Sequence, residues 1–135
     1  MLLMLVAVSG TGKSSIAKAL IAQNEKLSLS VSHTTRAPRP GELDGREYHF
    51  VDRDEFESLI ESDGLVEWAE YVGNCYGTGR KTIEDASREG RDLLFDIEVV
   101  GAAQIKAAFP GSVGVFIKFW WRESSVHNLG VRISI

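Results

Sequence analysis

The fold class of this chain is decided by one stretch close to its start, Ala7-Val8-Ser9-Gly10-Thr11-Gly12-Lys13-Ser14. The apolar run at residues 1–8 predicts a buried strand, and Ile16, Ala19 and Leu20 recur at helical spacing after the glycines. A strand, a glycine-rich turn and a helix in this order are typical of a phosphate-binding loop, here with alanine in place of the first glycine of the usual pattern. The sequence therefore predicts an α/β fold built around this loop.

The residue types of the loop suit phosphate chemistry. Gly10 and Gly12 let the backbone fold around phosphate oxygens, while loop amides and the helix N-terminus supply positive potential. Lys13 adds a mobile point charge, and the Ser14 hydroxyl can bind Mg²⁺. An ordinary glycine turn is the alternative, but the flanking strand and amphipathic helix favour nucleotide binding. The candidate phosphate-binding residues are Ser9, Gly10, Thr11, Gly12, Lys13, Ser14 and Ser15.

Composition and charge exclude several classes of protein. The 135 residues are 44% hydrophobic and 25% charged, which is typical of a globular domain and excludes disordered, collagen-like and coiled-coil chains. The net charge of -4 argues against a broad nucleic-acid-binding surface, and the apolar run at 1–8 is far shorter than the roughly 20 residues that span a bilayer. Cys75 is the single cysteine, which suits a reducing compartment. We expect a cytoplasmic protein with no nucleic-acid or membrane partner.

Strand and helix patterns alternate along the rest of the chain. Apolar or alternating runs indicate strands, and Asp52 followed by Glu55 is the signature of a helix start. Gly77-Thr78-Gly79 is expected to turn the chain. Strands alternating with helices at both ends imply a three-layer core with a parallel sheet, and the middle of the chain predicts a small mixed insert. Further strand patterns occupy residues 29–33, 47–51, 65–72, 92–97, 113–119 and 131–135, and helices are expected after Asp52 and near 81–88 and 101–109.

Two further groups of charged residues suit a phosphate ligand. Asp96 ends an apolar run, where the carboxyl end of a parallel strand faces the ligand crevice, so that its carboxylate can hold hydrated Mg²⁺. Arg36 and Arg39 lie in a loop with two prolines, and Tyr48 follows it. Two guanidinium groups and a phenol hydroxyl suit one phosphate monoester. The alternatives are a strand-end acid facing water and a solvated loop with incidental charge.

Six blocks of residues occur along the chain in the order seen in guanylate kinases. The longest, SVSHTTRAPRPGE at 30–42, is highly specific together with the phosphate-binding loop before it. The sequence resembles that family from about residue 2 to residue 117. The resemblance implies a nucleoside monophosphate kinase fold and the conversion of ATP and GMP to ADP and GDP with Mg²⁺. The blocks are residues 9–14, 30–42, 54–56, 67–69, 76–78 and 96–98.

The resemblance also implies a role for individual residues. The GMP phosphate would contact Arg36, Arg39, Tyr48 and Tyr76, and the guanine would contact Ser32, Glu67, Thr78 and Glu98. Lys13, Arg36 and Arg39 would be catalytic, and Ser14 and Asp96 would hold the metal. The chemistry of Glu67 agrees, because a carboxylate accepts hydrogen bonds from guanine N1–H and the 2-amino group, which adenine lacks. The implied organisation is a P-loop core at 1–33 and 79–117, a GMP-binding subdomain at 34–78 and a divergent tail at 118–135.

The sequence departs from the family pattern after Ile117. Positions matching the family's arginine-bearing lid and last elements are missing, which implies weak or no turnover. The chain is either a truncated or frame-shifted product, or a natural short form. A nucleotide- or phosphopeptide-binding module is the alternative function, although the intact Lys13 loop argues against it; Glu67 and Thr78 disfavour another nucleobase. The sequence does not define the oligomeric state.

Overall fold

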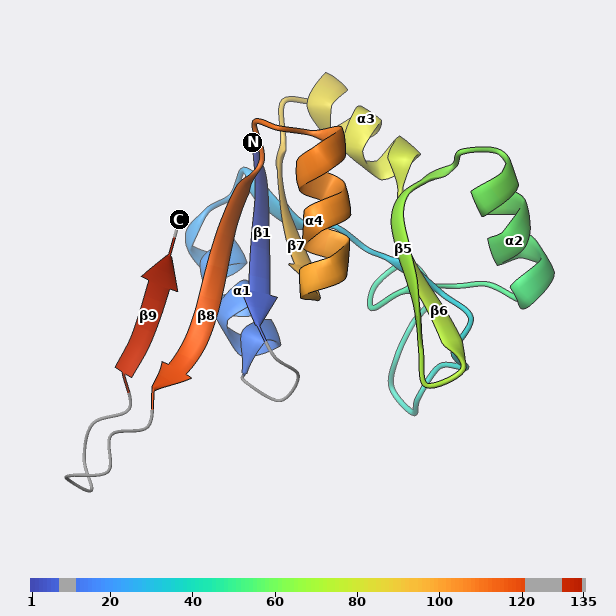
Figure 1. The fold of residues 1–135 in the computed structure, drawn as a ribbon, viewed down its shortest axis with the longest axis horizontal. Coiled ribbons are helices and arrows are strands. Elements are labelled where there is room, and N and C mark those ends of the chain that lie inside the picture. Colours follow the sequence, from blue (N-terminus) through green and yellow to red (C-terminus); the bar gives the residue numbers. More distant parts are fainter. Residues whose placement is uncertain (8–11, 121–129, 135) are drawn as a thin grey trace.

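The structure, a computed structural model, describes residues 1–7, 12–120 and 130–134. These residues form two sheets and four helices (Figure 1). The larger sheet, called the core sheet below, carries the first strand of the chain. The second, called the small sheet, lies beyond helix α4 and is built from the middle of the chain.

The core sheet is parallel except at one edge. β1 pairs with β7 on one side and with β8 on the other, and β9 runs antiparallel to β8. β1 is apolar along its whole length and β7 is apolar apart from Asp92 and Asp96, which suits strands whose two faces are covered by helices. The strand expected at 131–135 corresponds to β9. In spatial order the strands are β2 (Leu27–Leu29), β7 (Asp92–Ile97), β1 (Leu2–Ala7), β8 (Val113–Trp120) and β9 (Gly130–Ser134).

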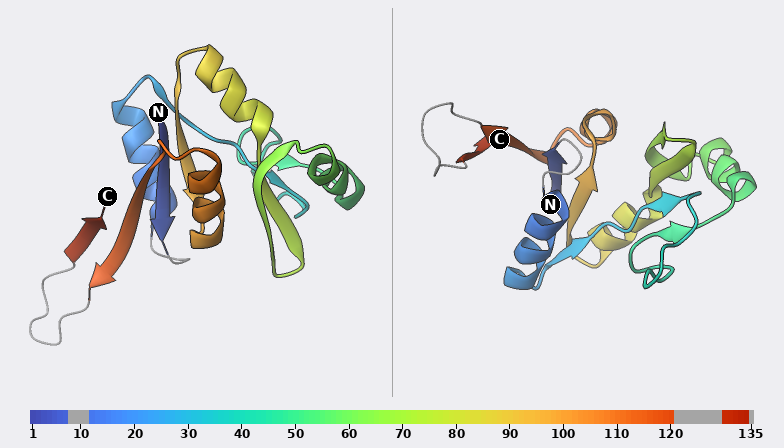
Figure 2. Two further views of the ribbon diagram at one scale, coloured as in Figure 1. Left: turned by 45° about the horizontal axis from the view of Figure 1, so that its top comes forward. Right: turned by 90° about the horizontal axis from the view of Figure 1, so that it is seen from below.

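Helices on both faces of the core sheet complete three layers. α1 (Lys13–Gln23) packs on one face, and α3 (Arg80–Arg88) and α4 (Val99–Ala108) pack on the other (Figure 2). Alternate residues of β1 point into the two resulting cores. The prediction of a three-layer α/β core is therefore confirmed. The α1 side contains Leu5, Ala17, Leu94 and Ile117, and the other side contains Met4, Ile83, Phe95 and Ile105.

The small sheet is mixed and is covered by one helix. β3 pairs in parallel with β4 and antiparallel with β6, and β5 and β6 form a hairpin. Helix α2 (Arg53–Glu61) packs on this hairpin through a small apolar cluster of Phe56, Leu65 and Cys75. In spatial order the strands are β4 (His49–Phe50), β3 (His33–Thr34), β6 (Asn74–Gly79) and β5 (Leu65–Tyr71).

The start of α2 follows the predicted signature. Asp52 Oδ1 accepts a hydrogen bond from the Glu55 amide at 2.8 Å, and Glu55 Oε2 accepts one from the Asp52 amide at 3.0 Å. This reciprocal pair satisfies two amides that the helix itself leaves without partners. The helix start inferred from the sequence is confirmed.

Two sequence predictions about local structure are wrong. Gly77-Thr78-Gly79 does not turn the chain but belongs to β6. Gly77 is needed for close approach instead, because a Cβ there would lie 3.0 Å from the Glu67 carbonyl oxygen and from Trp68 Cβ on β5. The alternating run at 29–33 is divided between β2 and β3, which belong to different sheets.

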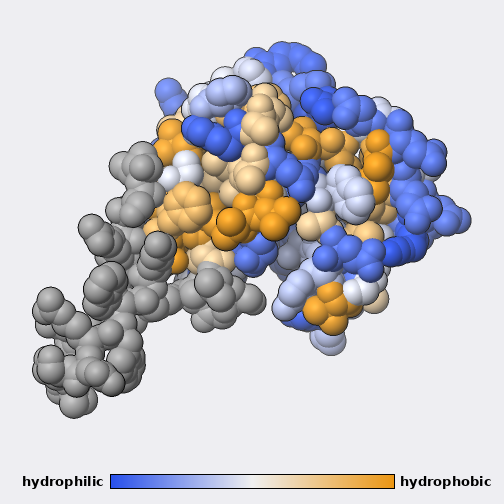
Figure 3. Space-filling view, in the orientation of Figure 1, coloured by the Kyte–Doolittle hydropathy of each residue, from blue (hydrophilic) through white to orange (hydrophobic). Residues whose placement is uncertain are grey.

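The surface differs between the two parts of the molecule. Apolar side chains gather over β8 and α4, while hydrophilic side chains cover α2 and α3 (Figure 3). The exposed apolar residues in the first area include Val99, Val100 and Phe116. Within the described ranges, the structure contains no helix of sufficient length and apolar character to cross a membrane.

Candidate nucleotide-binding site

The N-terminus of α1 begins at a glycine in a left-handed conformation. Gly12 has φ of 76°, and its carbonyl accepts hydrogen bonds from the amides of Ser15 and Ile16 at 3.1 and 3.2 Å. A Cβ at Gly12 would meet no atom within 4 Å, so the backbone angle and not the space requires glycine. Ser15 is exposed in the first turn. The predicted residues Ser9, Gly10 and Thr11 lie outside the described residues.

Lys13 lies at the centre of a group of charged and polar side chains, called the Lys13 cluster below. Its Nζ lies 3.0 Å from Asp96 Oδ1 and 3.5 Å from Glu98 Oε1, and it donates a hydrogen bond to the Ile97 carbonyl at 3.1 Å. Ser14 Oγ donates to Asp96 Oδ2 at 2.8 Å. The Lys13 side chain is only 12% exposed. The end of β7 and the start of α1 thus bring one cation, two carboxylates and one hydroxyl together.

The donors in this cluster suit Mg²⁺. Mg²⁺ prefers oxygen ligands and is commonly held by one or two carboxylates together with substrate phosphates. Ser14 Oγ and the Asp96 carboxylate are such oxygens. Among the described residues, no group of three or more His, Cys, Asp or Glu side chains forms a metal site made by the protein alone. The residues present therefore fit a metal that arrives with phosphate.

A second cation lies in the loop between β3 and β4. Both terminal nitrogens of Arg36 donate to the Glu42 carboxylate at 3.0 Å, and one also donates to the Ala37 carbonyl at 2.8 Å. The hydrogen bond to Glu42 is the largest contribution that raises the pKa of Arg36. The same bond is the main cause of a lowered pKa at Glu42. This bidentate ion pair fixes the plane of the guanidinium group.

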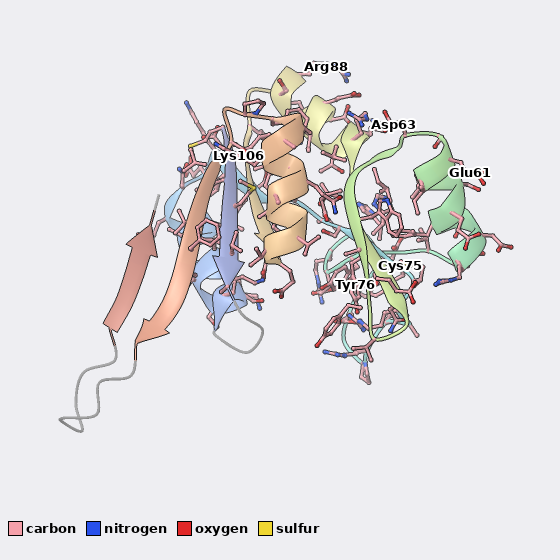
Figure 4. All side chains as sticks on the ribbon, in the orientation of Figure 1. Glu61, Asp63, Cys75, Tyr76, Arg88 and Lys106 are labelled. Carbon is pink, nitrogen blue, oxygen red and sulfur yellow. The ribbon has the colours of Figure 1, made fainter. Side chains whose placement is uncertain are left out.

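Aromatic rings surround this guanidinium group. Arg36 Cζ lies 5.3 Å from the centroid of the Tyr48 ring and 5.8 Å from that of Phe50. Tyr48 and Tyr76 meet edge to face at 5.9 Å, and Tyr76 projects from β6 into this region (Figure 4). Burial raises the pKa of the Tyr48 hydroxyl, the neighbouring Tyr76 raises it further, and the charge of Arg36 opposes the shift. The structure thus brings Arg36, Tyr48 and Tyr76 together.

Glu42 is a site residue that the sequence reasoning missed. Besides its ion pair with Arg36, its Oε2 accepts a hydrogen bond from the Arg39 amide at 2.7 Å. The Arg39 side chain is exposed, and its charge contributes to the lowered pKa of Glu42. The signal was present in the spacing, because an acid three residues after one arginine and six after the other can reach both across a tight turn.

Glu67 is a buried carboxylate on β5. Its residue is 6% exposed, and its Oε1 accepts a hydrogen bond from the Thr78 hydroxyl at 2.6 Å. Burial raises the pKa of Glu67, although the hydrogen bond from Thr78 opposes the shift. A buried acceptor of this kind requires a hydrogen-bond donor, and the Thr78 hydroxyl supplies one to Oε1. The structure therefore brings the predicted pair Glu67 and Thr78 together across the β5–β6 hairpin.

Two other predicted guanine contacts lie apart from this pair. Ser32 is partly buried just before β3, and its carbonyl accepts a hydrogen bond from the His49 amide at 2.9 Å. Glu98 directly precedes α4, and its exposed carboxylate lies beside Lys13. Within the described part of the chain, neither side chain is hydrogen-bonded to Glu67 or Thr78. The structure thus associates Glu98 with the Lys13 cluster.

Comparison with known proteins gives a consistent result over most of the chain. A family model described as guanylate kinase matches residues 1–130, which extends beyond residue 117, where the resemblance inferred from the sequence ends. A guanylate kinase from Bordetella pertussis is 53% identical over 114 residues, which are 84% of this chain and 53% of that protein. One from Dechloromonas aromatica is 48% identical over 116 residues, 86% of this chain and 57% of that protein.

A solved structure has the same fold. The crystal structure of guanylate kinase from Anaplasma phagocytophilum is 37% identical, with a TM-score of 0.72, and the match covers 86% of this chain and 58% of that one. The chain therefore spans about half the length of the curated relatives it matches. The Lys13 cluster, the Arg36–Glu42 ion pair and the buried Glu67 therefore occur together in a chain that belongs to the guanylate kinase family.

Proposed function

We propose that this chain binds ATP and GMP and transfers the γ-phosphate of ATP to GMP, which yields ADP and GDP. The observation that carries the proposal is the Lys13 cluster, in which Asp96 binds both Lys13 and Ser14 at the N-terminus of α1. Such a helix N-terminus, with a lysine and a hydroxyl, is suited to the β- and γ-phosphates of a nucleoside triphosphate. The family membership of the chain supports the same reaction.

ATP would occupy the loop from Ser9 to Ser15. Backbone amides of the loop and of the first turn of α1 would bind phosphate oxygens, and Lys13 would exchange its contacts with Asp96 and Glu98 for the transferred phosphate. Ser14 and Asp96 would hold Mg²⁺. When bound, Mg²⁺ would neutralise part of the negative charge on the phosphates.

GMP would occupy the face of the small sheet that is directed toward the core. Arg36, Tyr48 and Tyr76 would bind its phosphate, with Arg39 closing over the exposed side. This assignment is supported by the arrangement of Arg36, which Glu42 orients before any ligand binds. A fixed guanidinium plane lowers the entropy lost when two parallel hydrogen bonds form to a phosphate.

The guanine base would be recognised by Glu67 and Thr78, assisted by Ser32 and Glu98. The Glu67 carboxylate would accept hydrogen bonds from guanine N1–H and from the 2-amino group. Adenine carries neither donor at these positions, so AMP would leave a buried acceptor without a partner, which costs about 1–3 kcal/mol. Selectivity for GMP would follow from this penalty.

Catalysis would depend on position and charge. Lys13, Arg36 and Arg39 would hold the attacking phosphate of GMP and the transferred phosphoryl group in line, and would stabilise the negative charge between them. No side chain needs to act as a base, because phosphoryl transfer requires little covalent chemistry from the protein.

We also propose the organisation and location that the sequence indicated. The core would comprise residues 1–33 and 79–117, the GMP-binding subdomain 34–78 and the tail 118–135. The strands support this division, since those of the small sheet lie between His33 and Gly79. The single cysteine, Cys75, supports a cytoplasmic location, because it is buried and has no partner for a disulfide in this chain.

A coupled assay of ADP release tests the proposed reaction. With ATP and Mg²⁺ present, the chain should release ADP when GMP is added, and AMP should have little effect. The Lys13→Ala variant controls for contaminating kinases and should show no GMP-dependent release. If GMP binds in calorimetry but neither ADP release nor ATP binding is detected, the chain is a binding module and the proposed transfer is wrong.

A further inference from the structure

Helix α4 approaches the buried Glu67 without any side chain in between. Gly101 is buried in the first turn of α4, and a Cβ there would lie 2.7 Å from Glu67 Oε2 and 3.3 Å from Glu67 Cδ. Contacts below 3.0 Å force a displacement, and the group that must move here is the Glu67 carboxylate, whose other oxygen accepts the hydrogen bond from Thr78 at 2.6 Å. Glycine inside a helix is less stable than alanine. The space that Gly101 leaves for the Glu67 carboxylate explains why glycine occupies this position.

One turn later, the same helix binds the backbone next to Glu67. Gln104 Oε1 accepts a hydrogen bond from the Trp68 amide at 3.1 Å, and Gln104 Nε2 donates to the Trp68 carbonyl at 3.3 Å. β5 is an edge strand of the small sheet, so Trp68 presents these two groups on the side away from β6. The Gln104 amide therefore takes the place of a neighbouring strand and joins the small sheet to the core.

We propose that Gly101 and Gln104 are positioning residues for base recognition, and that together they form a seat on α4 for Glu67. Gln104 fixes the position of the β5 backbone relative to α4, and Gly101 fixes the position of the Glu67 carboxylate. The proposal rests on the proposed function, in which Glu67 recognises guanine. A side chain at position 101 would move the acceptor by more than the ~0.5 Å that a preorganised binding group tolerates.

The first test is calorimetric titration of GMP into the 135-residue chain and its Gly101→Ala variant. We expect GMP affinity to fall about 10- to 100-fold, ATP affinity to stay the same and the unfolding midpoint to be maintained, since alanine favours the helix. The preference for GMP over inosine monophosphate, which lacks the 2-amino group, should also decrease. Gly111→Ala is the matched control, because its Cβ would meet no atom within 4 Å.

A double-mutant cycle separates positioning from a general structural effect. Glu67→Asp shortens the side chain by one methylene and withdraws the carboxylate from position 101. On its own this change should weaken GMP binding, but in the Gly101→Ala background it should cause no further loss. Equal and additive losses in the two backgrounds would overturn the proposal, because only residues in contact show such coupling.

Gln104→Leu provides a second variant that does not alter the helix backbone. It removes both hydrogen bonds to Trp68 and should weaken GMP about 10-fold while ATP affinity is unchanged. If the unaltered chain binds GMP and both Gly101→Ala and Gln104→Leu bind it equally well, the seat on α4 is wrong. If Gly101→Ala does not fold, the result with Gln104→Leu decides. Failure of the unaltered chain to bind GMP would instead contradict the proposed function.

Discussion

The core and the small sheet stabilise their functional side chains differently. In the core, two apolar clusters on opposite faces of the sheet provide the stability, and the Lys13 cluster lies at the ends of elements that those clusters already hold. The small sheet has a smaller apolar cluster around Phe56, Val66 of β5 packs against one of the core clusters, and polar contacts add to this packing. These include the Arg36–Glu42 ion pair, the Glu67–Thr78 hydrogen bond and the Gln104–Trp68 bonds.

This difference predicts how mutations act in each region. A side chain of the Lys13 cluster can be truncated without loss of apolar packing. Its mutation should therefore change nucleotide affinity more than the free energy of unfolding. In the small sheet the same side chains hold the structure and face the proposed ligand. A mutation there should therefore change both binding and stability. Stability should fall where the mutation removes a contact, and rise where it removes the cost of burying a charge.

The largest expected effect is the removal of the Phe56 ring. Phe56 is fully buried, and Phe56→Ala should lower the free energy of unfolding by about 3–5 kcal/mol. GMP binding should be lost under conditions in which ATP still binds, since the core clusters are intact. Urea unfolding and calorimetry measure the two effects. Phe116→Ala is the control, because its exposed ring should contribute only about 0.5 kcal/mol; an equally small effect of Phe56→Ala would refute the comparison.

The next largest effect concerns the core cation. Lys13→Ala should weaken ATP binding at least about 100-fold, because the charge at the phosphates is lost and Asp96 and Glu98 are left to repel them. The unfolding midpoint should change little. Lys18→Ala, at an exposed position of the same helix, is the matched control in calorimetry. Unchanged ATP affinity in Lys13→Ala would rule out the assignment of the loop.

A smaller effect is expected in the loop between β3 and β4, which carries Arg36. Arg36→Lys keeps the charge but loses the planar group that pairs with Glu42, so GMP affinity should fall about 10-fold and the unfolding midpoint should fall with it. Arg46→Lys in the same loop changes an exposed ion pair with Glu47 and should affect neither quantity. GMP affinity that is insensitive to Arg36→Lys would contradict the phosphate assignment.

The smallest effect is a gain in stability at Glu67. Burial raises the pKa of Glu67 above its ordinary value of 4.5, so the folded chain favours the protonated carboxyl. That contribution to stability is present below the ordinary pKa and is lost as the pH rises through the raised pKa. Glu67→Gln should therefore increase the free energy of unfolding relative to the unaltered chain at about pH 8, and by less at about pH 4. Thermal unfolding across this range provides the test; a Glu67→Gln variant less stable at the higher pH would contradict it.

Much of the fold could be predicted because its signals are local. The apolar strands β1 and β7, the start of α1 directly after Gly12 and the capping box of Asp52 and Glu55 each depend on a few neighbouring residues of the sequence. Periodicity and turn chemistry act over the same distances. The order of these elements was then sufficient for the parallel core.

The features that were missed depend on contacts between distant residues. Gly77 resembled a turn residue because its close approach to Trp68 is visible only after β5 and β6 pair. The partners of Trp68 and Glu67 on α4, Gln104 and Gly101, lie more than thirty residues away along the chain. The role of Glu42 was local, but its three hydrogen bonds require the conformation of the loop and not only its composition.

The most direct test of the central claim is a pair of calorimetric titrations of the unaltered chain, one with GMP and one with AMP. If the buried carboxylate of Glu67 reads the base, GMP should bind with measurable heat, and AMP at the same concentration should bind at least about 10-fold more weakly. Equal affinity for the two nucleotides, or no binding of GMP, would contradict the account.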